Sequence, residues 1–157
     1  MFTPVYLGLG SNLGDREHYL EAAIKALSSH EAIEVVSVSD FFNTKAVAEF
    51  DQPDYLNAAL GVTTILSARE LLVVTQGIEN EYGRTSKGTY DPRTLDIDIL
   101  LYGNDVISED DFVVPHPLMH ERLFVLDPLV QIAPHLTHPI LQSTIEDLKQ
   151  MLGEPVA

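Results

Sequence analysis

The chain has 157 residues, enough for one domain with a sizeable hydrophobic core, and we expect a single domain over residues 1–157. A formal net charge of −15 argues against a nucleic-acid partner or an anionic membrane surface, and the absence of cysteine excludes disulfides, thiolate chemistry and cysteine-based zinc sites. The sequence has no signal-peptide pattern and no apolar run of transmembrane length, so it predicts a cytoplasmic protein, which we expect to be a monomer.

The first predicted element is a strand over residues 5–10, followed by a glycine-rich turn and a helix that Asp15 can cap. Gly8, Gly10 and Gly14 miss the spacing of a dinucleotide-binding turn by one residue. A tight turn that needs a positive φ angle is the simpler interpretation of these glycines.

Two further strands are predicted over residues 33–42 and 55–63, separated by a polar loop long enough to carry function. Asn57 lies on the same face of the third strand as Tyr55. An asparagine at an inward strand position is either a hydrogen-bonded core residue or a ligand-facing residue, because its carboxamide both donates and accepts.

Capping boxes mark two of the later helices. Ser67 and Glu70 predict the start of the second helix, and Ser143 and Glu146 predict the start of a terminal helix.

Between these helices, residues 109–111 are all acidic, which indicates a solvated turn.

The stretch 92–101 carries the strongest signal. Asp96 and Asp98 alternate with aliphatic residues, so both carboxylates lie on one face of a strand, about 6.6 Å apart along it. Two like charges beside a core are costly unless a cation lies between them, and Mg²⁺ prefers hard oxygen ligands of this kind. Because the strand continues into Leu100 and Leu101, we expect it to be central in its sheet.

A solvent-facing edge strand is the alternative interpretation of an isolated Asp-x-Asp pattern. The distribution of positive charge favours the metal site. The chain has only nine lysine and arginine residues, and four of them lie around this strand: Arg84, Lys87, Arg93 and Arg122. Scarce cations beside two carboxylates indicate a metal–phosphate ligand.

The order of elements is strand, helix, strand, strand, helix, strand, followed by a helical tail. This order predicts an α+β fold with a ferredoxin-like βαββαβ core, in which helices pack on one face of a mainly antiparallel sheet, plus a helical C-terminal extension. We expect the first strand and the strand of the Asp pair to be the two central strands.

Five stretches of the sequence, in the right order over nearly the whole chain, resemble the 6-hydroxymethyl-7,8-dihydropterin pyrophosphokinases of folate biosynthesis. They are residues 10–14 (GSNLG), 51–57 (DQPDYLN), 92–100 (PRTLDIDIL), 114–117 (VPHP) and 120–122 (HER). The resemblance implies transfer of the terminal diphosphate of ATP to the hydroxymethyl oxygen of the pterin, with release of AMP. It also implies two Mg²⁺ ions as cofactors, with ATP as co-substrate.

The resemblance further assigns roles to residues of this chain. The matched catalytic positions are Arg84, Arg93, Asp96 and Asp98, of which Asp96 and Asp98 are also the metal ligands. The matched ATP-binding positions are Gln76, Glu79, Arg84, Lys87, Arg93, Ile99, His116 and Arg122. The matched pterin-binding positions are Thr44, Val47, Tyr55, Asn57, Tyr90, Asp96 and Phe124. Tyr90 stands where many members of the family carry tryptophan, and it can cover the pterin in the same way.

A non-catalytic, metal-dependent nucleotide-sensing module is the alternative from a different functional class. Such a module would use the Asp pair and the arginines but would need no pterin pocket. Tyr55, Asn57 and Phe124 discriminate between the two, because two aromatic rings flanking an amide suit a flat heterocycle. RNA-binding modules also use this fold class, and the net charge of −15 argues against one here.

Overall fold

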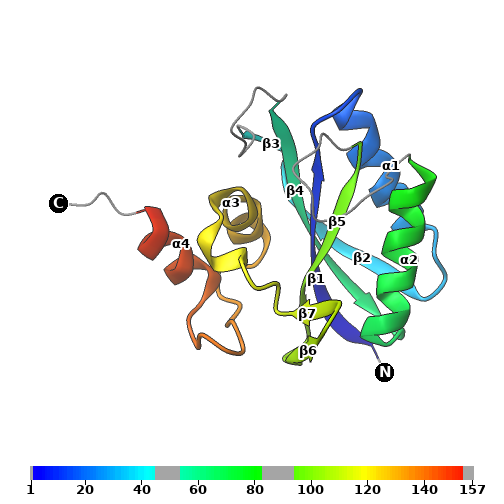
Figure 1. Cartoon of the computed structure of the whole chain (residues 1–157). Coiled ribbons are helices and arrows are strands. Elements are labelled where there is room, and N and C mark those ends of the chain that lie inside the picture. Colours follow the sequence, from blue (N-terminus) through cyan, green and yellow to red (C-terminus); the bar gives the residue numbers. More distant parts are fainter. Residues whose placement is uncertain (1, 45–53, 83–93, 154–157) are drawn as a thin grey trace.

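The structure is a computed structural model and describes residues 2–44, 54–82 and 94–153. Within these residues, five strands and two helices make up the first two thirds of the chain, and a two-stranded hairpin and the remaining helices follow (Figure 1). The elements are β1 (Thr3–Ser11), α1 (Arg16–Ser28), β2 (Ile33–Val38), β3 (Phe42–Thr44), β4 (Tyr55–Thr64), α2 (Ala68–Glu81), β5 (Asp96–Tyr102), β6 (Ile107–Glu109), β7 (Phe112–Val114), a short 3-10 helix (Met119–Glu121), α3 (Leu123–Ile132) and α4 (Ile145–Gly153).

The main sheet has the strand order β2-β4-β1-β5, every pairing is antiparallel, and the short β3 pairs with β4. This is the order of a ferredoxin-like βαββαβ core, so the predicted fold class is confirmed. The prediction of the two central strands is wrong for one of them. The central strands are β1 and β4, whereas β5 lies at the end of the sheet.

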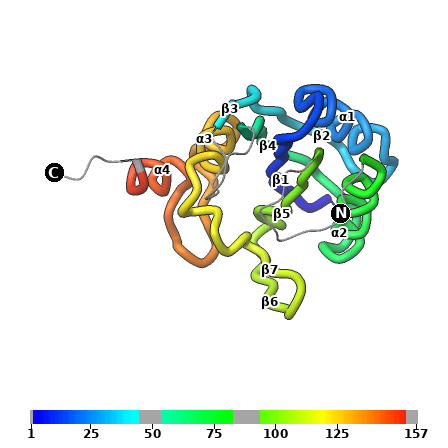
Figure 2. The backbone as a smooth tube through the Cα atoms, turned by 45° about the horizontal axis from the view of Figure 1, so that its top comes forward, coloured from blue at the N-terminus to red at the C-terminus, as the bar shows by residue number. Residues whose placement is uncertain are grey.

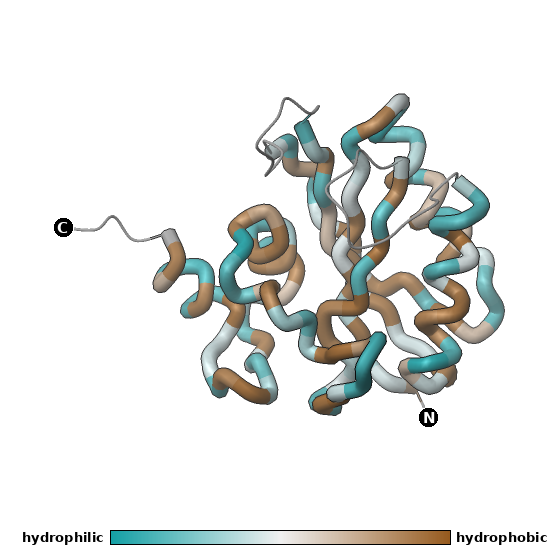
Figure 3. The backbone as a smooth tube through the Cα atoms, in the orientation of Figure 1, coloured by the Kyte–Doolittle hydropathy of each residue, from teal (hydrophilic) through white to brown (hydrophobic). Residues whose placement is uncertain are grey.

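The position of β5 explains why its sequence resembles that of a central strand. The backbone N–H of His116 donates to the carbonyl oxygen of Leu100 at 3.0 Å, so the chain after β7 covers part of the outer edge of β5. Both faces of the second half of β5 are also buried. In Figure 3 the strand alternates between hydrophilic and hydrophobic in its first half and is continuously hydrophobic toward its end.

The two helices of the core, α1 and α2, pack on one face of the sheet as predicted, and the helices of the C-terminal extension cover the other face (Figures 1 and 2). The core against α1 and α2 includes Leu7 and Leu9 of β1, Leu60 of β4, and Ile97 and Ile99 of β5. A second core lies against α3 and α4. Its sheet residues are Ala59, Leu100 and Leu101, and Tyr6 packs against it. The helical tail is therefore a third layer of the fold.

The predicted strand over residues 33–42 is interrupted. The Ser39 hydroxyl accepts the N–H of Ala59 at 2.8 Å, and the Ser39 N–H donates to the Ala59 carbonyl at 2.9 Å. Three residues of this strand then stand opposite two of β4, because Val38 pairs with Leu60 and Phe42 pairs with Asn57. The extra residue separates β2 from β3.

The acidic residues 109–111 are exposed at the turn of the β6–β7 hairpin, which confirms the predicted solvated turn. The Arg69 guanidinium also binds the carboxylates of Glu109 and Asp111 there, which was not predicted. These contacts lower the pKa of Asp111 below its usual value. The acidic turn sequence could not reveal that its partner is Arg69, which lies on α2 about 40 residues earlier in the chain.

Three of the predicted helix caps can be compared with the structure. Asp15 accepts from the N–H of His18, and Ser67 and Glu70 form the complete capping box, so both predictions are confirmed. The cap of α4 is displaced by one residue, because Thr144 rather than Ser143 accepts from the N–H of Asp147. None of the helices in the described parts of the chain is long and apolar enough to span a membrane.

Candidate active site

The strand register brings the predicted site residues of β4 and β5 to one face of the sheet. Gly10 of β1 stands opposite Asn57 on one side and Asp96 on the other, and Gly8 stands opposite Asp98. The neighbouring leucines of β1 lie in the core against α1 and α2, so the two glycines face the α3 side. The Asp pair and Asn57 thus share this face, and the residues of β1 that lie between them, Gly8 and Gly10, have no side chains.

Gly10 is required by close packing. A Cβ atom at this position would lie 3.1 Å from Oδ1 of Asn57 and 3.7 Å from Cδ1 of Tyr55. The tight-turn interpretation holds for Gly14, whose φ of +74° is the left-handed conformation that favours glycine. The dinucleotide-binding interpretation has no support, because Gly8 and Gly10 are strand residues.

The residues assigned to the pterin begin at the β3–β4 pair. Nδ2 of Asn57 donates to Oγ1 of Thr44 at 2.7 Å, and Asn57 is buried. Tyr55, which pairs with Thr44, is half-buried at the start of β4. The Asn57 carboxamide therefore has a protein partner and retains hydrogen-bonding capacity for a ligand.

Two predicted site residues lie at the start of helix α3, Phe124 in its first turn and Arg122 at the N-cap position before it. Phe124 is half-buried there, and the Arg122 guanidinium carbon lies 5.5 Å from the centre of its ring. This distance is within the range of a cation–π contact, which orients the arginine. The end of α3 is joined to the segment between β2 and β3 by two hydrogen bonds between Gln131 and Asp40.

Glu79, the acidic residue among those assigned to ATP binding, is deeply buried. Its side chain is 2% exposed, and Oε2 accepts from the backbone N–H of Ile97 at 2.7 Å. Ile97 lies between Asp96 and Asp98, so α2 is hydrogen-bonded to the strand at the centre of the Asp pair. An acidic residue on the apolar face of α2, beside Thr75 and Ile78, was the sequence signal for this buried contact.

The other ATP assignments occupy different environments. Gln76 is exposed on α2. The Ile99 side chain lies in the core against α1 and α2, so any nucleotide contact at this position involves its backbone. His116 is half-buried, and its Nδ1 accepts from the N–H of Leu118 at 3.3 Å.

Five predicted site residues lie outside the described residues: Val47, Tyr90, Arg84, Lys87 and Arg93. Tyr82 and Thr94, the described residues on either side of 83–93, are hydrogen-bonded to each other: the Thr94 hydroxyl donates to the Tyr82 carbonyl. Of the four cations that the sequence groups around the Asp strand, Arg122 is the one in the described part of the chain.

The donor chemistry of the Asp pair fits magnesium. Asp96 and Asp98 offer carboxylate oxygens on one half-buried strand face, and Mg²⁺ commonly binds through one or two carboxylates together with substrate phosphates. Within residues 2–44, 54–82 and 94–153, no group of three or more His, Cys, Asp or Glu side chains could hold a metal by itself. A metal bound by the Asp pair would take further ligands from substrate phosphates or water.

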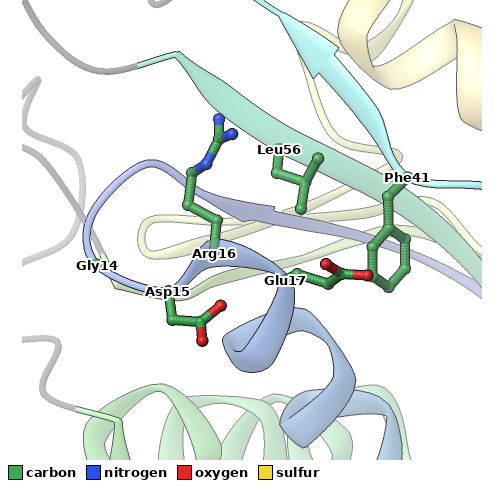
Figure 4. A pocket seen from close by; sticks show the side chains of 6 residues that line it. All are labelled: Gly14, Asp15, Arg16, Glu17, Phe41 and Leu56. Carbon is green, nitrogen blue, oxygen red and sulfur yellow. The ribbon is translucent and has the colours of Figure 1, made fainter.

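A cleft of about 430 Å³ lies away from this face, at the start of α1 (Figure 4). Its lining residues are Gly14, Asp15, Arg16, Glu17, Phe41 and Leu56. Phe41 and Leu56 pack against the core of α1 and α2. The cleft therefore does not contain any of the residues that the sequence assigns to ATP or the pterin.

The sequence matches a family of known proteins. The model of the family described as 7,8-dihydro-6-hydroxymethylpterin-pyrophosphokinase (HPPK) matches residues 6–134. Among curated proteins, the chain is 49% identical over 127 residues to the 2-amino-4-hydroxy-6-hydroxymethyldihydropteridine pyrophosphokinase of Bacillus subtilis, covering 81% of this chain and 76% of that protein. It is 44% identical over 145 residues to the protein of the same name from Haemophilus influenzae, covering 92% and 91%.

Solved structures show the same fold. A Plasmodium falciparum HPPK-DHPS chain superposes with a TM-score of 0.76 at 15% identity, covering 96% of this chain and 43% of that longer chain. At this identity the likeness concerns the fold alone. The match to the family model and the identity to curated relatives show that the chain belongs to the HPPK family.

Proposed function

We propose that this chain transfers the diphosphate group of ATP to the hydroxymethyl oxygen of 6-hydroxymethyl-7,8-dihydropterin, with release of AMP, as a step of folate biosynthesis. Membership of the HPPK family supports this reaction. The structural observation that carries it is the register in which Gly10 stands between Asn57 and Asp96. A pterin bound beside Asn57 would lie next to the Asp pair, so its hydroxymethyl oxygen could reach Asp96.

In this proposal the described residues act by binding and orientation. Asp96 orients the substrate hydroxyl and accepts a hydrogen bond from it, and Asp98 shares with Asp96 the binding of the metal ions. Two Mg²⁺ ions, when bound, would neutralise phosphate charge and clamp the attacking and leaving oxygens. His116 and Arg122 bind the ATP phosphates, because an arginine fork matches phosphate oxygens. Gln76 and the backbone at Ile99 would contribute to the nucleotide site.

The pterin would lie between the rings of Tyr55 and Phe124, which suits a flat heterocycle. Asn57 and Thr44 would bind its polar edge. The assignments to Val47, Tyr90, Arg84, Lys87 and Arg93 rest on the sequence resemblance and are part of the same proposal. In it the arginines neutralise charge as the diphosphate is transferred.

Product analysis tests the reaction. The protein is incubated with Mg-ATP, with and without 6-hydroxymethyl-7,8-dihydropterin, and the nucleotides are separated. AMP that forms only with the pterin supports the proposal, whereas ADP would mean attack at the γ-phosphorus. Asp96→Asn and Asp98→Asn should each abolish AMP formation. Asp127→Asn, which removes a surface ion pair with Lys149 at 3.1 Å, should retain it.

The non-catalytic nucleotide sensor is not favoured, because the relatives are named as pyrophosphokinases. ATP binding without turnover in the same experiment would revive it. The monomeric state and the cytoplasmic location expected from the sequence stay proposals, and light scattering of the purified chain tests the first of them.

A further inference from the structure

Arg16, the first residue of α1, binds two segments that lie far from it in the sequence. One nitrogen, Nη1, donates to Oδ1 of Asn43 at 2.8 Å and to the backbone carbonyl of Asp54 at 2.7 Å. Nδ2 of Asn43 in turn donates to Oδ2 of Asp54 at 3.2 Å. We call these three residues the Arg16 clamp. In Figure 4 the Arg16 side chain extends from the start of α1 alongside Leu56 of β4.

The clamp lies directly beside residues assigned to the pterin. Asn43 precedes Thr44 in β3, and Asp54 precedes Tyr55 at the start of β4. Thr44 and Tyr55 are cross-strand partners, at the end of the β3–β4 pairing. Strand ends separate easily, so additional bonds at this point determine how firmly Thr44 is held against β4.

Holding Thr44 in place also fixes the carboxamide of Asn57. The Thr44 hydroxyl accepts from Nδ2 of Asn57 at 2.7 Å, and Oδ1 of Asn57 lies against Gly10 on its other side. A shift of β3 away from β4 would remove the hydroxyl partner and allow the amide to rotate. The position of β3 therefore controls the orientation of the group that would read the pterin edge.

The chemistry of arginine suits this position. Both hydrogens of Nη1 are used, one for each oxygen, and the planar guanidinium holds them in a fixed geometry. The side chain is half-buried, which strengthens hydrogen bonds from a charged donor. Helix α1 directly follows β1 in the chain, and β1 is the strand between Asn57 and the Asp pair. The clamp therefore also connects β3 and β4 to the end of β1.

We propose that Arg16 is a positioning residue for the pterin substrate: it fixes Thr44 and Asn57 by bonding Asn43 and Asp54. This inference rests on the proposed pterin site. It assigns Arg16 no contact with the substrate. It predicts a selective effect on the pterin, because the described residues assigned to ATP lie on α2, β5 and the chain before α3, and none of them belongs to the clamp.

The test compares Arg16→Met and Arg16→Lys with the wild-type chain. Pterin binding is followed by its fluorescence in the presence of a non-hydrolysable ATP analogue, and KM values for pterin and ATP are measured with kcat. Arg16→Met should weaken pterin binding about tenfold, the effect of losing roughly one charged hydrogen bond, and change the KM for ATP less than twofold. Arg16→Lys, which keeps the charge, should recover part of the loss.

Arg69→Met is the matched control, because Arg69 also lies in the first turn of a helix and binds two acceptors, Glu109 and Asp111, at a distant hairpin. It should bind pterin as the wild type does. Asn43→Ala should resemble Arg16→Met, and the double variant should be no worse than the more affected single one.

Unchanged pterin binding in Arg16→Met, or equal losses for pterin and ATP, would overturn the inference. So would a fall in the thermal midpoint with no change in pterin affinity, since that is a merely structural role. If the wild-type chain and Arg69→Met bind no pterin at all, the proposed pterin site fails, and this inference fails with it.

Discussion

Replacing Gly10 by alanine tests whether the glycine of β1 creates the space in which Asn57 lies. The added Cβ would lie 3.1 Å from Oδ1 of Asn57, so the carboxamide must yield by a few tenths of an ångström. Asn57 is buried and bonded to Thr44 at 2.7 Å, and it has little freedom to move without lengthening that bond. Overpacking of this kind costs about 1–2 kcal/mol. If this cost reduces the free energy of pterin binding, the affinity for pterin falls roughly 5- to 30-fold.

The assay is pterin titration in the presence of a non-hydrolysable ATP analogue, with thermal unfolding measured in parallel. Gly8→Ala is the matched control on the same strand, because its Cβ would meet the Leu100 side chain at an ordinary 3.5 Å. It should bind pterin as the wild type does, although Gly8 stands opposite Asp98. Equal pterin affinity for Gly10→Ala and the wild type, or equal losses in both alanine variants, would refute the reasoning.

Three further predictions concern stability. Glu79→Leu removes the acceptor of the Ile97 N–H and should lower the free energy of unfolding by about 1–3 kcal/mol, whereas Glu79→Gln keeps an acceptor and should lose less in thermal unfolding. Burial, followed by repulsion from His120, lowers the pKa of His138 below its ordinary 6.5. The folded state therefore resists protonation, so its stability is complete above pH 6.5 and falls with pH below it. Urea unfolding at several pH values should show this slope, and it should be smaller in His138→Asn. Gly77→Ala, in open space within α2, should raise the thermal midpoint, at about 0.5–1 kcal/mol of added stability.

Local patterns predicted the elements of the fold well, because each depends on near neighbours in the sequence. The alternation around Asp96 and Asp98 and the capping box at Ser67 are of this kind. The edge position of β5 could not be predicted from its sequence. The chain at His116 covers its outer edge, and a strand covered in this way is as aliphatic as a strand that has a neighbouring strand on each side. Only the three-dimensional path of the chain after β7 distinguishes the two.

The candidate site was predicted less completely, for a related reason. The resemblance assigned Asn57 to the pterin, and the β4 register put it beside Gly10. The need for glycine there depends on cross-strand distances that no spacing along the chain contains. Glu79 was assigned to ATP binding, whereas its described contact is a structural hydrogen bond to Ile97. Arg16 received no role, because its acceptors lie 27 and 38 residues away.

The edge position of β5 has a consequence for association between molecules. An edge strand is a template on which another chain can add a strand, and proteins commonly oppose this with charged residues or a covering segment. Here the chain at His116 covers the edge at Leu100, and the first half of the strand carries the charges of Asp96 and Asp98. The same two carboxylates that the proposed chemistry requires would thus also oppose aggregation through this edge.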